Sequence, residues 1–302
     1  MKPRVVIAVG ALLVAALVAA AFLARSKSTP ASVSAPPQPA GATRHPGFPS
    51  PPAGAVVYAR EWGGSALALG VVPEGSHVLV EASVVGPQGK GVPGLRVSLA
   101  GRDAAACGLG CYRARLSPSP RAIDVRIGSL TWHVPLPKPW PPRDGRALVE
   151  RAAATWRGLR SLSFHERLAS DLEHSVTSTW RVQAPDRVAY EVGTGSAGIV
   201  VGPRRWDKAT RKTPWVESPQ TPLTQPVPPW VAVTDAHVLS TGTLRGRAVW
   251  HISFFDPGTP AWFQVAIDRQ SYRTLDSRMI TTAHFMHDVY AGFNTTPPIS
   301  PP

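Results

Sequence analysis

Two cysteines close together in the chain carry its most reactive side chains. Cys107 and Cys111 are the only cysteines, and the glycines at 108 and 110 allow a tight turn between them. Outside the cytoplasm, such a pair forms a disulfide. The alternative is a redox or Cu(I)-binding dithiol, because soft thiolates suit that ion. We favour the disulfide, because a redox pair normally sits at a helix N-terminus, and this pair lies between predicted strands.

A second candidate site lies near the C-terminus, where His284 and Met286 are two residues apart. On a strand they share one face with Asp288, whereas His287 points the other way. A His and Met pair on one face could bind copper. The alternative, which we favour, is a half-buried structural strand. We therefore expect no cofactor and keep copper as the weaker alternative.

Motifs of the common hydrolases and nucleotide-binding enzymes are absent from the chain. It contains no Gly-x-Ser-x-Gly, no His-Glu-x-x-His and no phosphate-binding loop. Nothing in the sequence places a serine, a histidine and an aspartate together. We therefore predict that the protein is not an enzyme and name no catalytic residue.

The segment 56–137 shows the pattern of a small β-sandwich. Apolar and polar residues alternate along 78–85, 95–99 and 123–127, which is the period of strands with one buried face. Glycine- and proline-rich turns separate these runs, and no helical period is present. Six or seven short strands in this length predict an Ig-like sandwich.

The segment 144–295 begins with a predicted helix and continues as strands. Asp144 is a plausible N-cap, and Leu148, Ala152, Trp156 and Leu159 form one apolar stripe of about four turns. The strands that follow have short connections, as in an antiparallel meander. The exception is a proline-rich loop at 213–230, which we interpret either as a functional lid or as a cap on the edge of the core. A curved antiparallel sheet wrapped on one long helix is the expected α+β half-barrel.

The opening helix and three short segments carry a resemblance to a known family. The opening helix, Trp180–Arg187, Ile199–Gly202 and Ala261–Asp268 resemble the LolA-like lipoprotein carriers and their lipid-binding relatives. The resemblance covers about half of the chain and implies a cavity between the concave sheet face and the helix. The alternative is that the aromatic residues simply fill this space. The predicted cavity residues are Leu148, Ala152, Trp156, Leu159, Phe164, Trp180, Tyr190 and Trp262.

A narrower resemblance concerns short pieces of both predicted domains. Arg60–Trp62, Cys107–Cys111 and Ala283–Met286 are similar to the extracytoplasmic tails of actinobacterial copper-transport and copper-resistance membrane proteins. Those tails are attached to polytopic membrane domains, whereas only one apolar segment is present here. The resemblance implies a copper-handling accessory as the alternative function.

The N-terminal segment indicates a membrane anchor. Residues 5–24 are an uninterrupted uncharged run, which is long enough to cross a hydrocarbon core of about 30 Å. The alternative is a cleaved signal peptide, for which Ala19–Ala21 offers a small-residue cleavage site. Either interpretation places the rest of the chain outside the cytoplasm. We expect an anchor over 1–25, a proline-rich linker over 26–55, a proline-rich tail over 296–302 and single-pass attachment to the plasma membrane.

The net charge of +13 is spread thinly along the chain. Basic and acidic residues number five and none in 1–55, eight and five in 56–137, and nineteen and fourteen in 138–302. Without a concentrated basic face, this pattern excludes nucleic acid as the expected partner. We therefore predict a membrane-tethered, non-enzymatic binding protein for a lipid or a lipidated partner. The alternatives are a copper-handling accessory and a structural envelope protein without a small ligand.

Overall fold

The computed structural model describes residues 50–117, 120–169, 174–281 and 284–302. The predicted anchor at 1–25 and the linker up to residue 49 lie outside the described residues. Within the described ranges, no helix combines the length and the apolar character that a membrane crossing requires.

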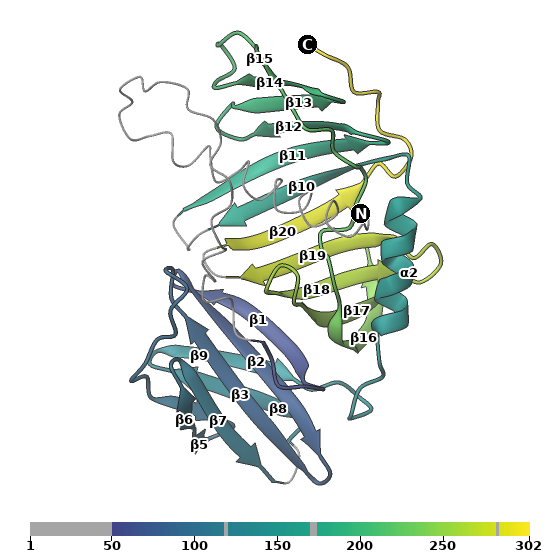
Figure 1. Ribbon diagram of the computed structural model, residues 1–302. Coiled ribbons are helices and arrows are strands. Elements are labelled where there is room, and N and C mark those ends of the chain that lie inside the picture. The colour runs from purple at the N-terminus through teal and green to yellow at the C-terminus, as the bar shows by residue number, and fades with distance from the viewer. Residues whose placement is uncertain (1–49, 118–119, 170–173, 282–283) are drawn as a thin grey trace, which may run out of the picture.

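Two sheets form the N-terminal part of the described chain (Figure 1). They pack face to face, because alternate residues of both sheets, such as Leu67, Val80, Val125 and Ile127, are buried in one shared core. The Ig-like topology of this region stays a prediction. One sheet has the order β1 (Val56–Trp62), β2 (Ser65–Glu74), β3 (His77–Val85), β7 (Cys111–Leu116) and β6 (Ala105–Gly108). The other has the order β5 (Arg102–Asp103), β4 (Val97–Leu99), β8 (Ala122–Ile127) and β9 (Leu130–Pro135).

A single sheet of eleven antiparallel strands makes up most of the C-terminal part, and it is open at both edges in the described residues. The predicted class, mainly β with one helix on an antiparallel sheet, is confirmed. The strand order is β15 (Val216–Pro219), β14 (Arg204–Lys208), β13 (Ala197–Val201), β12 (Arg187–Val192), β11 (Ser175–Gln183), β10 (Ser161–Ala169), β20 (His284–Ala291), β19 (Thr274–Thr281), β18 (Ala261–Asp268), β17 (Arg247–Asp256) and β16 (Thr234–Leu244).

The helix α2 (Arg146–Arg157) lies against one face of this sheet (Figure 1). Gly145 occupies the N-cap position, and the Asp144 carboxylate accepts a hydrogen bond of 2.7 Å from the Arg146 amide. The apolar face that is buried consists of Val149, Ala152, Ala153 and Trp156. The predicted stripe is therefore rotated: Leu148 is only partly buried, and Leu159 is buried beyond the end of the helix. An apolar stripe about 100° wide admits either rotation, and packing selects one.

The two faces of the large sheet bury different surfaces. The helix face contributes Phe164, Trp180, Phe254, Phe263 and Tyr290 to a core that it shares with α2. The sandwich face contributes other large residues to a second core with β1, β2 and β3, namely Phe255, Trp262, Ile280 and Phe285. Neighbouring residues such as Phe254 and Phe255 point to opposite faces because side chains alternate along a strand. Both faces are apolar near the middle of the sheet, so the sandwich is packed directly against it.

The proline-rich loop predicted at 213–230 is shorter than expected. Residues Val216–Pro219 form the edge strand β15, which pairs with β14. The remaining part covers the helix face, and its Leu223 and Trp230 side chains are buried in the core. Trp230 packs edge-on against Phe254 with ring centroids 5.4 Å apart. The loop therefore caps the core, as one of the two interpretations anticipated.

Candidate ligand-binding site

A cavity of about 210 Å³ lies between the helix face of the sheet and the proline-rich loop. Its floor comes from β10, β11, β12, β19 and β20, and Trp156 closes one side from α2. The roof is the segment 225–229, in which three prolines limit the backbone freedom of the loop. The residues that line it are mostly aromatic or aliphatic: Trp156, Phe164, Glu166, Leu168, Trp180, Val182, Val188, Gln225, Val227, Pro228, Pro229, Thr259, Met279, Thr281, His284, Met286, Asp288 and Tyr290.

Aromatic contacts hold the walls of the cavity in place. Phe164 and Trp180 are cross-strand partners whose rings stack 5.7 Å apart at an interplanar angle of 4°. Trp156 meets Tyr290 edge-on at 5.0 Å, and its indole N–H donates a hydrogen bond of 3.1 Å to Thr274 Oγ1. Such pairs stabilise the fold beyond their buried area by about 0.5–1.5 kcal/mol each. The walls are thus fixed by contacts with the sheet and the helix.

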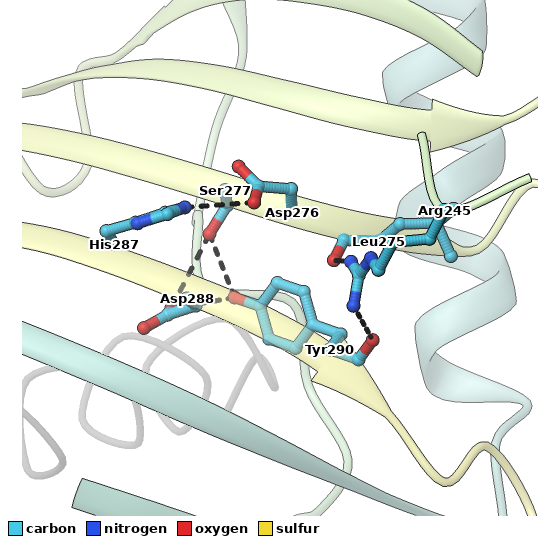
Figure 2. Close-up of polar contacts among 7 residues, drawn as sticks. All are labelled: Arg245, Leu275, Asp276, Ser277, His287, Asp288 and Tyr290. Atoms are coloured by element: carbon cyan, nitrogen blue, oxygen red, sulfur yellow. Dashed lines mark hydrogen bonds and ion pairs between the residues drawn. The ribbon is translucent and has the colours of Figure 1, made fainter. Parts of the chain in front are cut away.

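Two buried carboxyl groups interrupt the apolar floor. Glu166 on β10 pairs directly with Asp288 on β20, and each side chain is less than 5% exposed. Ser178 donates a hydrogen bond of 3.0 Å to Glu166. Tyr290 donates one of 2.7 Å to Asp288 Oδ2, and Ser277 lies 3.5 Å from the same oxygen (Figure 2). The other carboxylate oxygen of Asp288, Oδ1, is buried and has no hydrogen-bond partner in the part of the chain that the structure describes.

The protonation of these groups is shifted by their surroundings. Burial raises the pKa of the Asp288 carboxyl well above its ordinary value, and the neighbouring Glu166 charge raises it further. Burial likewise raises the pKa of Glu166, against the opposing effect of the hydrogen bond from Ser178. The pKa of the Tyr290 phenol is also raised by burial and by the Asp288 charge. The site therefore favours uncharged carboxyl groups unless a positive charge comes close.

The predicted cavity residues divide between this cavity and the surrounding structure. Trp156, Phe164 and Trp180 line it. Leu148, Ala152 and Leu159 belong to the core cluster of the helix face without lining the cavity.

The remaining two predicted cavity residues, Tyr190 and Trp262, point elsewhere. The Tyr190 ring contacts Trp180 at 4.7 Å, but its hydroxyl lies 3.3 Å from the Asp207 carboxylate, outside the cavity. Trp262 lies on the sandwich face, because it neighbours Phe263 and the two side chains alternate.

The predicted copper ligands line the same cavity. His284 and Met286 both lie on its wall, and Met279 on β19 is the direct cross-strand partner of Met286. His287 points to the opposite face, as expected, where it contacts the Asp276 carboxylate at 2.9 Å. The histidine and the two methionines therefore share one apolar wall.

Cys107 and Cys111 are joined in a disulfide where β6 meets β7. Among the described residues, Glu81 and these two cysteines are the one group with three potential metal-binding side chains close together. Both sulfur atoms are in the disulfide, so this group offers no thiolate to a metal ion. The disulfide lies in the sandwich and does not line the cavity.

Several cavity residues escaped the sequence analysis. They include the roof residues and the two acids Glu166 and Asp288. A charged residue on an otherwise apolar strand face is the signal that could have identified Glu166. The roof residues carry no comparable signal, because a loop has no periodicity that tells which side chains turn inward.

Among known proteins, similarity to this chain is found only with solved structures. No family model and no curated protein sequence matches it. Among solved structures, lipoprotein LppX of Mycobacterium tuberculosis is similar with 14% identity and a TM-score of 0.41, over 51% of this chain and 97% of that one. LprF of Mycobacterium bovis is similar with 11% identity and a TM-score of 0.36, over 52% and 95%. A LolA superfamily protein of Nitrosomonas europaea has 9% identity and a TM-score of 0.23, over 49% and 93%.

Proposed function

We propose that the protein is a non-enzymatic binding protein whose cavity holds an apolar ligand, such as part of a lipid or of a lipidated partner. The observation that carries this proposal is the cavity of about 210 Å³ with mostly aromatic and aliphatic walls. Small-molecule sites have this character, with a few polar groups that orient the ligand. Apolar cavities of about 150 Å³ already bind benzene. The volume suits one ring or a short length of acyl chain, and a larger ligand requires the roof at 225–229 to move outward.

The location proposed for this function is the outer side of a membrane. The uncharged run 5–24 would anchor the chain, and the proline-rich linker would hold the folded part away from the surface. Arginine at both positions 14 and 17 should abolish membrane retention, because each charge costs about 2.5–3.5 kcal/mol at the centre of a spanning helix. Cell fractionation measures the retention. A mature N-terminus near residue 25 would instead identify a signal peptide.

The test of the apolar ligand is to fill the cavity. Leu168 lines it, whereas Leu162 lies on the same strand in the filled core. Leu168→Trp should abolish binding of a fluorescent fatty-acid probe while it changes the unfolding free energy by less than about 1 kcal/mol, because the new ring occupies free space. Leu162→Trp, the matched control, should lower that free energy by about 1–3 kcal/mol through overpacking.

The outcomes of this test separate a binding cavity from a packing defect. Retained probe binding in a folded Leu168→Trp protein would contradict the proposal. Absence of probe binding by the parent protein, together with no lipid in organic extracts of protein purified from its native membrane, would also contradict it.

A second candidate is copper handling, which the pairing of Met286 with Met279 favours. Thioether ligands select Cu(I), and His284 adds an imidazole on the same wall. Titration of Cu(I) against a competing chelator, with Met279→Leu and Met286→Leu variants, tests it. Equal affinity in the parent protein and in the variants would reject this candidate.

A further inference from the structure

Glu166 and Asp288 are buried at the floor of the cavity. A positive charge beside them would stabilise their ionised forms, but the described residues supply none. In the described residues, the hydrogen-bond donors to Glu166 and Asp288 are all neutral groups: the hydroxyls of Ser178, Ser277 and Tyr290, and the indole of Trp180. The indole of Trp180 donates to Ser178 in turn, at 2.8 Å. The pair is therefore hydrogen-bonded, and no cationic side chain of the described ranges neutralises it.

One acceptor of this pair remains available. Asp288 is 3% exposed and lines the cavity, and its oxygen Oδ1 has no hydrogen-bond partner among the described residues. An unsatisfied buried acceptor destabilises a fold by about 1–3 kcal/mol, and more when it is charged. A structure that retains one at the wall of a cavity is suited to a ligand that supplies the donor.

We propose that the cavity binds an amphiphile with a primary ammonium group, which donates to Asp288 and lies against Glu166 while its apolar body packs against Phe164 and Trp180. This inference rests on the proposed function and names the chemical class of its ligand. An ammonium has three donors and one positive charge, so it satisfies Asp288 Oδ1 and compensates the acid pair in one contact. Hydrogen bonds between charged groups are about twice as strong as neutral ones, and the dry surroundings strengthen the attraction.

Other ligand end groups fit these residues less well. A carboxylate would bring a further negative charge and no donor to two acids that already disfavour each other's ionisation, because the Glu166 charge raises the pKa of Asp288. A hydroxyl could donate to Oδ1 but would leave the charge uncompensated. The other titratable groups on the wall are His284 and Tyr290, both on β20. His284 lies four residues from Asp288 on the same strand face, toward the other end of the floor.

Three probes of equal length distinguish these end groups: octylamine, octan-1-ol and octanoate. Each would be titrated calorimetrically at pH 7.5 into the full chain in lipid nanodiscs, with empty nanodiscs as the blank. Octylamine should bind about tenfold more tightly than octan-1-ol, because only it brings both charge and donors to Asp288. Octanoate should bind most weakly.

Variants of the two acids link this preference to the site. Asp288→Asn and Glu166→Gln each keep the shape of the side chain and remove the charge, and each should reduce the preference for octylamine to about twofold or less. Octan-1-ol, titrated in parallel, gives the neutral reference for each variant, and circular dichroism with a cooperative urea transition shows that the variants are folded. The control is Glu191→Gln, an exposed residue of β12 that pairs with Arg211 at 3.4 Å and should keep the full preference.

The results separate this inference from the function on which it rests. Octan-1-ol or octanoate binding as tightly as octylamine would overturn the inference and leave an apolar-ligand protein. A preference that persists in both acid variants would overturn it as well, because the ammonium would then bind elsewhere. If none of the three probes binds, the proposed function fails and the inference fails with it.

Discussion

At the scale of single residues, Asp288 and Glu166 lie on a mostly apolar face of the sheet, although their cross-strand neighbours Ser277 and Ser178 are polar. Their partners along the same face, Phe164, Leu168 and Met286, form the wall of the cavity. Two carboxyl groups at such positions oppose folding whenever they are charged, because burial disfavours the charged form. Two acids at such buried positions are therefore candidates for a function. The free energy that their ionisation costs can be measured from the pH dependence of unfolding.

The first prediction concerns the pH dependence of stability. Burial raises the pKa of Asp288 in the folded protein, whereas the unfolded chain has an ordinary value of about 3.9. Its contribution to stability is thus complete below about pH 4 and is lost as pH rises through the folded pKa. Asp288→Asn removes this loss, so its unfolding free energy should fall less between pH 4 and pH 8 than that of the parent protein.

Urea unfolding at several pH values, followed by tryptophan fluorescence, measures this difference. The raised pKa of Glu166 leaves a smaller dependence of the same sign in the variant. Parallel pH profiles of the parent protein and Asp288→Asn would show that Asp288 titrates as an ordinary carboxyl and contradict the prediction.

The second prediction concerns the disulfide between Cys107 and Cys111. Closure of so short a loop should stabilise the fold by about 2 kcal/mol in the chain-entropy model. A double Cys→Ser variant should therefore lose about 2 kcal/mol of unfolding free energy and retain ligand binding, because the bond lies outside the cavity. Alkylation without reductant checks the bond itself, and labelling of both cysteines in the exported parent protein would refute it.

At the scale of elements, a glycine on β13 leaves the space that an aromatic ring on the neighbouring strand β12 occupies. Gly198 is the direct partner of Tyr190, and a Cβ atom at residue 198 would lie 2.4 Å from the Tyr190 ring. The ring is held in this place by Trp180 on one side and by its hydroxyl contacts with Asp207 and Arg205 on the other. It therefore cannot move aside without breaking other contacts.

The third prediction is that Gly198→Ala lowers the unfolding free energy by about 1–3 kcal/mol, the usual range for overpacking. In a Tyr190→Ala background, the same change should cost much less, because the ring that it meets is gone. A double-mutant cycle of the four proteins by urea unfolding gives the coupling between the two positions. Equal costs in both backgrounds would show that contact with Tyr190 is not the cause.

At the scale of the whole molecule, the sandwich and the large sheet share an apolar contact (Figure 1). Val57 on β1 is 1% exposed and belongs to the same cluster as Phe255 and Trp262. The Arg167 guanidinium lies 3.3 Å from the Glu61 carboxylate between the same two parts. Because this contact is largely apolar, separating the two parts would expose it to water. We therefore expect both parts to unfold together.

The fourth prediction is that the described part unfolds in one calorimetric transition that Val57→Asp splits into two. An aspartate there places a charge in the shared cluster, which costs several kcal/mol unless the two parts separate. The neighbouring Val56 points into the core of the sandwich, so Val56→Asp should instead unfold the sandwich and leave a single transition, that of the large sheet. A single transition at lower temperature in Val57→Asp would mean that the sheet does not fold without the sandwich.

The sequence alone determined the strands, the helix and the cysteine pair, because each depends on residues that are close together in the chain. Period-2 alternation predicted strands such as 78–85 and 123–127, because a strand with one buried face carries that pattern in its own residues. The helix near 146–157 and the pairing of two cysteines four positions apart are also local properties. The mainly β class followed from these signals.

Tertiary structure alone decided which faces meet and what they enclose. In β17 and β18 both faces carry large apolar residues where Phe254 and Phe255 lie opposite Phe263 and Trp262, so alternation could not tell that Trp262 contacts the sandwich while Phe263 faces the helix. Glu166 and Asp288 are far apart in the chain, and the pairing of β10 with β20 brings them together. The roof of the cavity comes from a loop whose inward side chains have no period. Contacts of this kind depend on strand register and on packing between distant segments, which no local pattern specifies.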